Sequence, residues 1–126
     1  MPDRTKLSTI QQIAVTVSNV DTALAFYHEL LGLELLFRPG DNLAFLDAAG
    51  IRIMLTTPQG AGAVGSNSIL YFRVDGITAV YEELCERGAV TERKPQLAAR
   101  LPDHELWTGF LRDPDGNLVG LMEEKR

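Results

Sequence analysis

Apolar and polar residues follow the same succession of periods twice along the chain. In the first half, residues 10–18 alternate with the period of a strand, and Asn19 then precedes apolar residues at helical spacing. We expect this helix to end at Gly32, because glycine readily adopts the left-handed conformation that closes a helix. Three short strands separated by turn residues complete the half: 33–37, 42–47 and 51–56.

The second half repeats this order. Residues 68–74 alternate as a strand, Asp75 is expected to cap the next helix, and Gly88 is expected to end it. The apolar stripe of this helix has helical spacing and consists of Ile77, Val80, Tyr81, Leu84 and Cys85. Further strands are expected near 89–91, 106–112 and 118–123. Each half therefore predicts a β-α-β-β-β module.

One such module leaves a bare sheet face, so two modules must pair to bury apolar surface. The expected fold class is α+β, in a single domain of residues 1–126. Module one spans about 8–57 and module two about 67–124. The segment 58–66, rich in Gly, Pro and Ala, has no helical or strand period and is expected to link them.

Two turn sequences predict how strands align. The Asp-Pro-Asp-Gly sequence that begins at Asp113 suits a three-residue hairpin loop, which places Phe110 opposite Gly120. The matching turn at 47–50 gives two expected pairs in module one: Leu46 with Arg52, and Ala44 with Met54. The same alternation places Phe45 toward the helices and Leu46 on the opposite, open face of its sheet.

The composition narrows the class of protein. The chain has 126 residues and a formal net charge of -5, which argues against a nucleic-acid partner because no basic stripe can neutralise phosphates. The single Cys85 excludes an intrachain disulfide and a cysteine-based zinc site, and it suits a reducing compartment. No apolar run approaches the length of a membrane span. We therefore expect a cytoplasmic protein with no membrane partner.

Three segments carry a combination of motifs: IAVTVSNVDTALAFYHELLGL at 13–33, YFRVDGITAVYEELCERGA at 71–89, and DPDGNLVGLME at 113–123. Together they resemble the vicinal oxygen chelate superfamily, the glyoxalase/bleomycin-resistance/dioxygenase group, over 10–123. This resemblance implies two modules that form a cupped mixed sheet around a small-molecule site. It also implies a homodimer, with the modules paired either within one chain or by exchange between two chains. Because the superfamily contains both enzymes and binding proteins, the fold does not determine the function.

In the metal-dependent proteins that the chain resembles, the first and last strands of each module supply the ligands. The matching positions here are Gln12, Met54, Ile69 and Gly120. Ile69 and Gly120 have no side-chain donor, and the thioether of Met54 is too soft for Mg, Mn or Zn. Gln12 alone is similar to a residue of some glyoxalase I enzymes. We therefore expect no metal site and no cofactor.

Strand alternation places a mixed set of side chains on the pocket-facing side of the sheets. The expected ligand-binding residues are Gln12, Arg52, Met54, Ile69, Tyr71, Arg73, His104, Phe110 and Gly120. Arg52 and Arg73 have guanidinium groups that suit a carboxylate or phosphate, although strand arginines also extend to solvent or pair with acidic residues. Tyr71 and Phe110 suit either stacking on a ligand or core packing. Arg112, beside the turn, is expected to pair with an acidic residue or reach solvent.

His104 is the one candidate catalytic residue. It lies just before a strand and is expected to face the mouth of the pocket, where a histidine can act as an acid or base near neutral pH. The alternative is a histidine that stabilises a loop. Trp107, by the same alternation, is expected to pack on the helix side.

The missing metal ligands and the expected ligand-binding residues together favour a metal-independent protein that binds a polar or anionic small molecule with an aromatic or apolar body. The alternative is an enzyme, either a glyoxalase-I-like lyase or isomerase with a non-standard site around Gln12, or a metal-free catalyst centred on His104. A third possibility is an interaction protein whose open sheet face buries a dimer interface.

Overall fold

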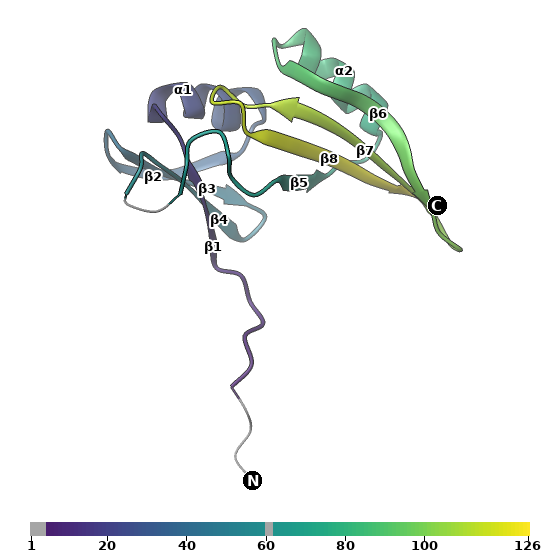
Figure 1. Ribbon diagram of the computed structural model, residues 1–126, viewed down its shortest axis with the longest axis horizontal. Coiled ribbons are helices and arrows are strands. Elements are labelled where there is room, and N and C mark those ends of the chain that lie inside the picture. The colour runs from purple at the N-terminus through teal and green to yellow at the C-terminus, as the bar shows by residue number, and fades with distance from the viewer. Residues whose placement is uncertain (1–4, 60–61) are drawn as a thin grey trace.

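Two modules with the same order of elements make up the computed structural model, which describes residues 5–59 and 62–126 (Figure 1). Module one contains β1, α1, the π-helix η1, β2, β3 and β4, at Gln12–Thr16, Val20–Leu24, Ala25–Leu30, Glu34–Gly40, Leu43–Ala48 and Ile51–Thr56. Module two contains β5, α2, β6, β7 and β8, at Leu70–Arg73, Ile77–Glu86, Val90–Arg100, Glu105–Arg112 and Leu118–Lys125. Of the expected linker 58–66, residues 60–61 lie outside the described residues.

Each module forms its own four-stranded sheet, with the orders β1-β4-β3-β2 and β5-β8-β7-β6. The pairs β1–β4 and β5–β8 are parallel and the remaining pairs are antiparallel, so both sheets are mixed. This confirms the expected α+β fold of two βαβββ modules, with a strand order that suits a cupped sheet. No helix within the described ranges is long and apolar enough to cross a membrane.

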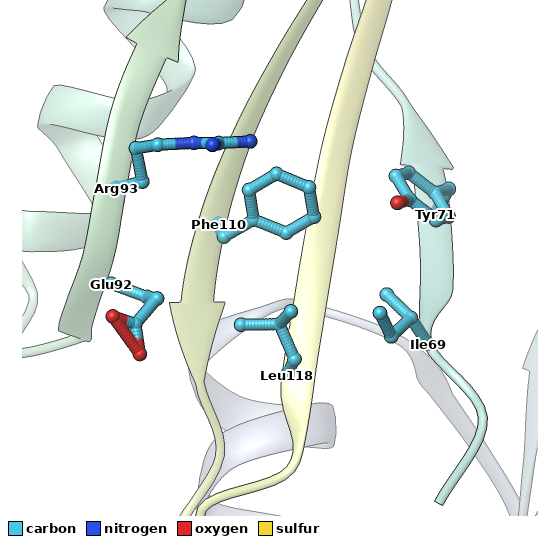
Figure 2. A pocket seen from close by; sticks show the side chains of 6 residues that line it. All are labelled: Ile69, Tyr71, Glu92, Arg93, Phe110 and Leu118. Carbon is cyan, nitrogen blue, oxygen red and sulfur yellow. The ribbon is translucent and has the colours of Figure 1, made fainter.

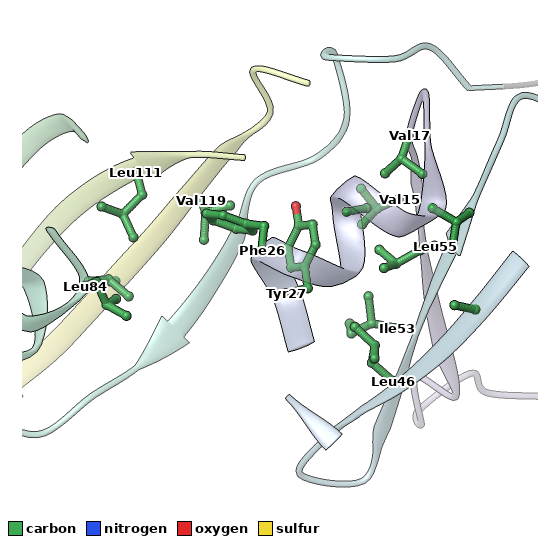
Figure 3. Packing of buried hydrophobic residues seen from close by; sticks show 14 of the residues in the cluster. Val15, Val17, Phe26, Tyr27, Leu46, Ile53, Leu55, Leu84, Leu111 and Val119 are labelled. Atoms are coloured by element: carbon green, nitrogen blue, oxygen red, sulfur yellow. The ribbon is translucent and has the colours of Figure 1, made fainter. Parts of the chain in front are cut away.

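The helices cover one side of each sheet and meet in a core to which both modules contribute (Figure 3). Val15 and Leu55 of module one and Leu111 and Val119 of module two are at most 2% exposed, and they belong to one cluster that includes Tyr27. Burying each side chain of this size contributes about 1.5–3 kcal/mol. Apolar packing therefore holds the two modules against one another.

A polar network reinforces this seam between the modules. The buried hydroxyl of Tyr27 donates a hydrogen bond to Oδ2 of Asp113 at 2.7 Å, and Asn117 Nδ2 donates to the same oxygen at 2.8 Å. Asn67 Oδ1 accepts from Thr16 N at 3.1 Å, while Asn67 Nδ2 donates to Asn117 Oδ1 at 2.9 Å. Burial raises the pKa of Tyr27 well above its usual range, and the neighbouring Asp113 carboxylate raises it further. The Asp-Pro-Asp-Gly turn thus also serves to join the modules, because its Asp113 accepts the hydrogen bond from Tyr27 of module one.

The two hairpin predictions have opposite outcomes. Phe110 lies opposite Gly120, as expected, and the turn is closed by a hydrogen bond from Gly116 N to Asp113 O at 2.9 Å. In module one the predicted pairs are wrong by one residue, because Leu46 lies opposite Ile53 and Ala44 opposite Leu55.

The reason for this shift is a two-residue turn. Ala49 and Gly50 have positive φ values of 51° and 97°, so Ala48 pairs directly with Ile51. Positive φ at both central residues is the pattern of a type I′ turn, which suits a two-residue hairpin. A slip of one residue exchanges the faces of a strand. Leu46 is therefore fully buried, and Phe45 instead lies opposite Met54.

The strand β6 is much longer than the expected strand near 89–91. It spans Val90–Arg100 and pairs with β7 through a register interrupted by bulges. Pro95 lies within it, which an edge strand tolerates because one side of that strand makes no ladder bonds. The extended strand places Arg93 opposite Phe110.

The two helical N-termini are capped differently. Asn19 Oδ1 accepts a hydrogen bond from Thr22 N at 2.9 Å, which confirms the expected cap of α1. The expected cap of α2 by Asp75 is wrong. Glu123, from β8, accepts hydrogen bonds from Gly76 N at 2.8 Å and Ile77 N at 3.0 Å, and these bonds lower its pKa.

Candidate functional site

A hollow of about 270 Å³ lies on the open face of the module-two sheet (Figure 2). It is lined by residues from β5, β6, β7 and β8 and from the segment before β5: Ile69, Tyr71, Glu92, Arg93, Phe110 and Leu118. We call it the module-two hollow. Its wall combines apolar surface with a small number of polar groups, as small-molecule sites do.

The floor of the hollow is aromatic. The rings of Tyr71 and Phe110 meet edge to face, with centroids 5.7 Å apart and an interplanar angle of 78°. Beneath them, a Cβ built on Gly120 would lie 2.6 Å from Cδ1 of Tyr71, which is closer than real Cβ contacts come. Gly120 therefore allows the Tyr71 ring to lie directly against the strand.

Arg93 is the cationic group of the hollow, and the sequence did not identify it. Its Cζ lies 4.9 Å from the centroid of Phe110, in cation–π contact. The acidic neighbour Glu92 is paired instead with Arg112, whose Nε donates to Oε1 of Glu92 at 2.7 Å. This pairing fits the expectation for Arg112, and it leaves the charge of Glu92 balanced.

Module one carries a second cluster on its own open face. Arg52 Nε donates to Oε1 of Gln12 at 2.8 Å, and Gln12 Nε2 lies 3.6 Å from Sδ of Met54. The Arg52 guanidinium lies 5.1 Å from the centroid of Phe45, which stacks on Phe37 at 4.6 Å. Phe45 is thus part of this face, contrary to the alternation expected from the sequence.

The structure divides the expected ligand-binding residues between these two faces. Ile69, Tyr71, Phe110 and Gly120 are brought together in module two, and Gln12, Arg52 and Met54 in module one. No hydrogen bond, ion pair or aromatic contact joins the two sets within residues 5–59 and 62–126.

Arg73 lies elsewhere. It lines a groove of about 590 Å³ at the seam of the modules, where the remaining wall is mostly aliphatic. Ile69 and Tyr71 border both this groove and the module-two hollow. Among residues 5–59 and 62–126, Arg73 is the only charged residue that lines the groove, so this larger space has fewer polar groups with which to orient a ligand.

His104 lies in the connection between β6 and β7, near the end of β8. Its Nδ1 is 2.7 Å from Oδ1 of Asp103 and its Nε2 is 3.5 Å from Oε2 of Glu124. Hydrogen bonds from His104 and Arg126 lower the pKa of Asp103. Phe110 lies six residues after His104 along β7, or about 20 Å at a rise of roughly 3.3 Å per residue. The structure therefore does not bring His104 to the module-two hollow.

Trp107 packs against the shared core, as expected for the helix side of its strand. Its indole Nε1 donates to Oε1 of Glu105 at 3.1 Å, and Lys125 lies 4.4 Å from the ring centroid. The ring is therefore held by its own neighbours and does not line the hollow.

The positions that correspond to superfamily metal ligands do not fit a metal ion. Gln12 and Met54 lie on the module-one sheet, Gly120 lies on β8 and Ile69 lies just before β5. Of these four residues only Gln12 has a hard donor atom. The Tyr71 ring fills the space next to Gly120, where a longer side chain would have to extend. Within the described residues, no group of three or more His, Cys, Asp or Glu side chains is arranged to hold a metal.

Comparison with known proteins establishes the family. A model of the Glyoxalase/Bleomycin resistance protein/Dioxygenase superfamily matches residues 9–121. The chain therefore belongs to this superfamily, which agrees with the resemblance inferred from its motifs. It is also 26% identical over 128 residues to the uncharacterized protein YraH of Bacillus subtilis (strain 168), covering 89% of this chain and 95% of that protein.

Solved structures with the same fold have different functions. TnmS3, an antibiotic binding protein from Streptomyces sp. CB03234, is 26% identical with a TM-score of 0.75, over 97% of this chain and 100% of that chain. The lactoylglutathione lyase from Agrobacterium tumefaciens is 24% identical with a TM-score of 0.76, over 94% and 95% of the two chains. At 24% identity, the similarity to the lyase shows the fold alone, so the function must be argued from the site.

Proposed function

We propose that this protein binds a polar or anionic small molecule in the module-two hollow, without a metal ion. The observation that carries the proposal is the pairing of an aromatic floor, Tyr71 and Phe110, with a guanidinium, Arg93, at its side. Such a wall supplies apolar contact area together with one strong orienting group. The similarity to TnmS3, which is described as an antibiotic binding protein, supports a binding role.

The glyoxalase-like alternative is less well supported by the geometry. Lewis-acid catalysis needs several hard donors around one metal ion. Gln12 lies on the module-one face and is engaged by Arg52, and Gly120 lies beneath Tyr71 on the other sheet. The proposed function therefore assigns no step to a metal.

Native mass spectrometry of protein purified without chelators tests this proposal. We expect substoichiometric Zn, Ni, Mn and Fe in the wild type and in Gln12→Ala. A stoichiometric metal that is lost on Gln12→Ala would overturn the proposal that the protein works without a metal ion. The same spectra report any small molecule that remains bound after purification.

We further propose that the protein is a homodimer in which the open faces are covered. Phe37 of module one and Tyr71 of module two are each 49% exposed, although both are large aromatic residues. Covering them with a second copy would remove apolar surface from water and complete the wall of the hollow. The expected superfamily homodimer fits this arrangement.

Light scattering coupled to size-exclusion chromatography tests the dimer. We expect a dimeric mass for the wild type and a shift toward monomer for Phe37→Glu. The matched control is Leu101→Glu, because Leu101 is 45% exposed but lies in the turn between β6 and β7. A monomeric wild type would contradict the proposal.

We also propose that residues 1–126 act as one domain and that the protein is cytoplasmic. The shared core supports the first statement. The single, unpaired Cys85 supports the second, since reducing compartments keep cysteines free. Fractionation of cells that produce the protein tests its location.

A further inference from the structure

We propose that the module-two hollow selects flat aromatic acids, with Arg93 binding the acid group and Tyr71 and Phe110 contacting the ring. This inference rests on the proposed small-molecule binding function and specifies the class of ligand.

The charge of the hollow favours an anion. Two charged residues line it, Glu92 and Arg93. Glu92 is neutralised by Arg112, which lies 2.7 Å away through its Nε. The side chain of Arg93 makes no hydrogen bond or ion pair in the part of the chain that the structure describes. Its donors are therefore available to a ligand, and an unbalanced positive charge remains beside the aromatic floor.

The geometry of Arg93 suits a carboxylate next to a ring. Figure 2 shows its side chain extending from β6 over Phe110. Contact with the ring, at 4.9 Å from the guanidinium carbon to the Phe110 centroid, restricts the positions of the guanidinium, so less conformational freedom is lost when it binds an acid. A guanidinium can then donate two parallel hydrogen bonds to a carboxylate, which an amide or an alcohol cannot accept in the same way.

The shape of the hollow favours a flat ring of small size. Tyr71 lies edge to face with Phe110, so the two rings of the floor are set at an angle. The apolar side chains of Ile69 and Leu118 lie beside them. The volume of about 270 Å³ is just below the roughly 300–1,000 Å³ of sites for drug-sized ligands. A single aromatic ring or two fused rings with a carboxylate fill such a space better than a long aliphatic acid.

Isothermal titration with matched probes tests this inference on the full-length protein. The probes are benzoate and 2-naphthoate, their neutral amides, and hexanoate as an acid without a ring. In the wild type we expect 2-naphthoate to bind about 10- to 100-fold more tightly than 2-naphthamide, as charge-assisted hydrogen bonds imply. Arg93→Gln should abolish this preference, and Arg93→Lys should restore only part of it.

Arg100→Gln is the matched control, because Arg100 lies on the same strand but pairs with Glu105 at 3.7 Å outside the hollow. It should leave the preference unchanged. If acid and amide bind equally well in the wild type, or if Arg93→Gln keeps the preference, the selectivity for acids is overturned while the binding function stands. Failure of the aromatic acids to bind while hexanoate binds would overturn the selectivity for rings, and failure of every probe, hexanoate included, at millimolar concentration would overturn the proposed function itself.

Discussion

The ring of Tyr71 lies against the backbone of Gly120, one of the four positions that the resemblance matches to metal ligands. A Cβ at residue 120 would be 2.6 Å from Cδ1, 2.9 Å from Cε1 and 3.1 Å from Cγ of Tyr71. The Tyr71 ring thus occupies the space that a metal-ligating side chain at residue 120 would need. The contact between Tyr71 and Gly120 therefore has two consequences. It forms part of the floor of the hollow, and it leaves no room for a donor side chain at residue 120.

The first prediction concerns this contact. Gly120→Ala should push the Tyr71 ring outward, lower the free energy of unfolding by about 1–3 kcal/mol, and weaken binding of 2-naphthoate. In a Tyr71→Ala background, which removes the clash, the same substitution should cost less. Urea denaturation of the four proteins measures this coupling. An equal effect of Gly120→Ala in both backgrounds would contradict the assigned contact.

The second prediction concerns the seam between the modules. Tyr27→Phe removes a hydrogen bond to the buried carboxylate of Asp113 and should lower the free energy of unfolding by about 1.5–3 kcal/mol at neutral pH. Denaturation curves of both proteins give this difference. Tyr71→Phe, which removes the hydroxyl of a half-exposed ring, is the control and should change stability little.

The third prediction gives the pH dependence of that seam. The folded pKa of Tyr27 is raised above its ordinary value, so its stabilising effect is complete below about pH 10 and is lost as the pH rises further. The wild type should therefore lose stability above about pH 10 more steeply than Tyr27→Phe. Thermal melts across this range measure it. Parallel loss in the two proteins would mean that Tyr27 does not carry the effect.

The fourth prediction concerns the cap of α2. Glu123→Ala should lower the free energy of unfolding by about 1 kcal/mol, because two backbone N–H groups lose their acceptor. Since the folded pKa of Glu123 is lowered, its contribution is present above about pH 4.3 and is lost as the pH falls through the folded pKa. The variant should thus differ from the wild type at neutral pH and approach it in acid. Asp75→Ala is the matched control and should have the smaller effect.

The fifth prediction concerns His104. His104→Ala should leave the affinity for 2-naphthoate unchanged, since about 20 Å of strand separates it from Phe110 at roughly 3.3 Å per residue. It should lower the melting temperature slightly, because its contacts with Asp103 and Glu124 are lost. Titration and thermal melts of the variant test both statements. If His104→Ala remained folded but no longer bound 2-naphthoate, His104 would belong to the site after all.

The sequence predicted the features that depend on neighbouring residues. Strand and helix periods, the cap at Asn19 and the Asp-Pro-Asp-Gly turn are all local signals, and they gave the order of elements and the pairing of Phe110 with Gly120. The resemblance to the family came from the motifs at 13–33, 71–89 and 113–123. The aromatic half of the candidate site followed from that pairing for Phe110 and from the alternation of residues 68–74 for Tyr71.

Tertiary structure decided the features that depend on distant partners. Glu123 caps a helix that begins 46 residues earlier, and Arg93 reaches the hollow only because β6 continues along β7 past its bulges. The face of Phe45 depends on positive φ at Ala49, which alanine does not signal. Local preferences set the period of a segment, but the energy of burying one face against the rest of the chain sets its register and its neighbours.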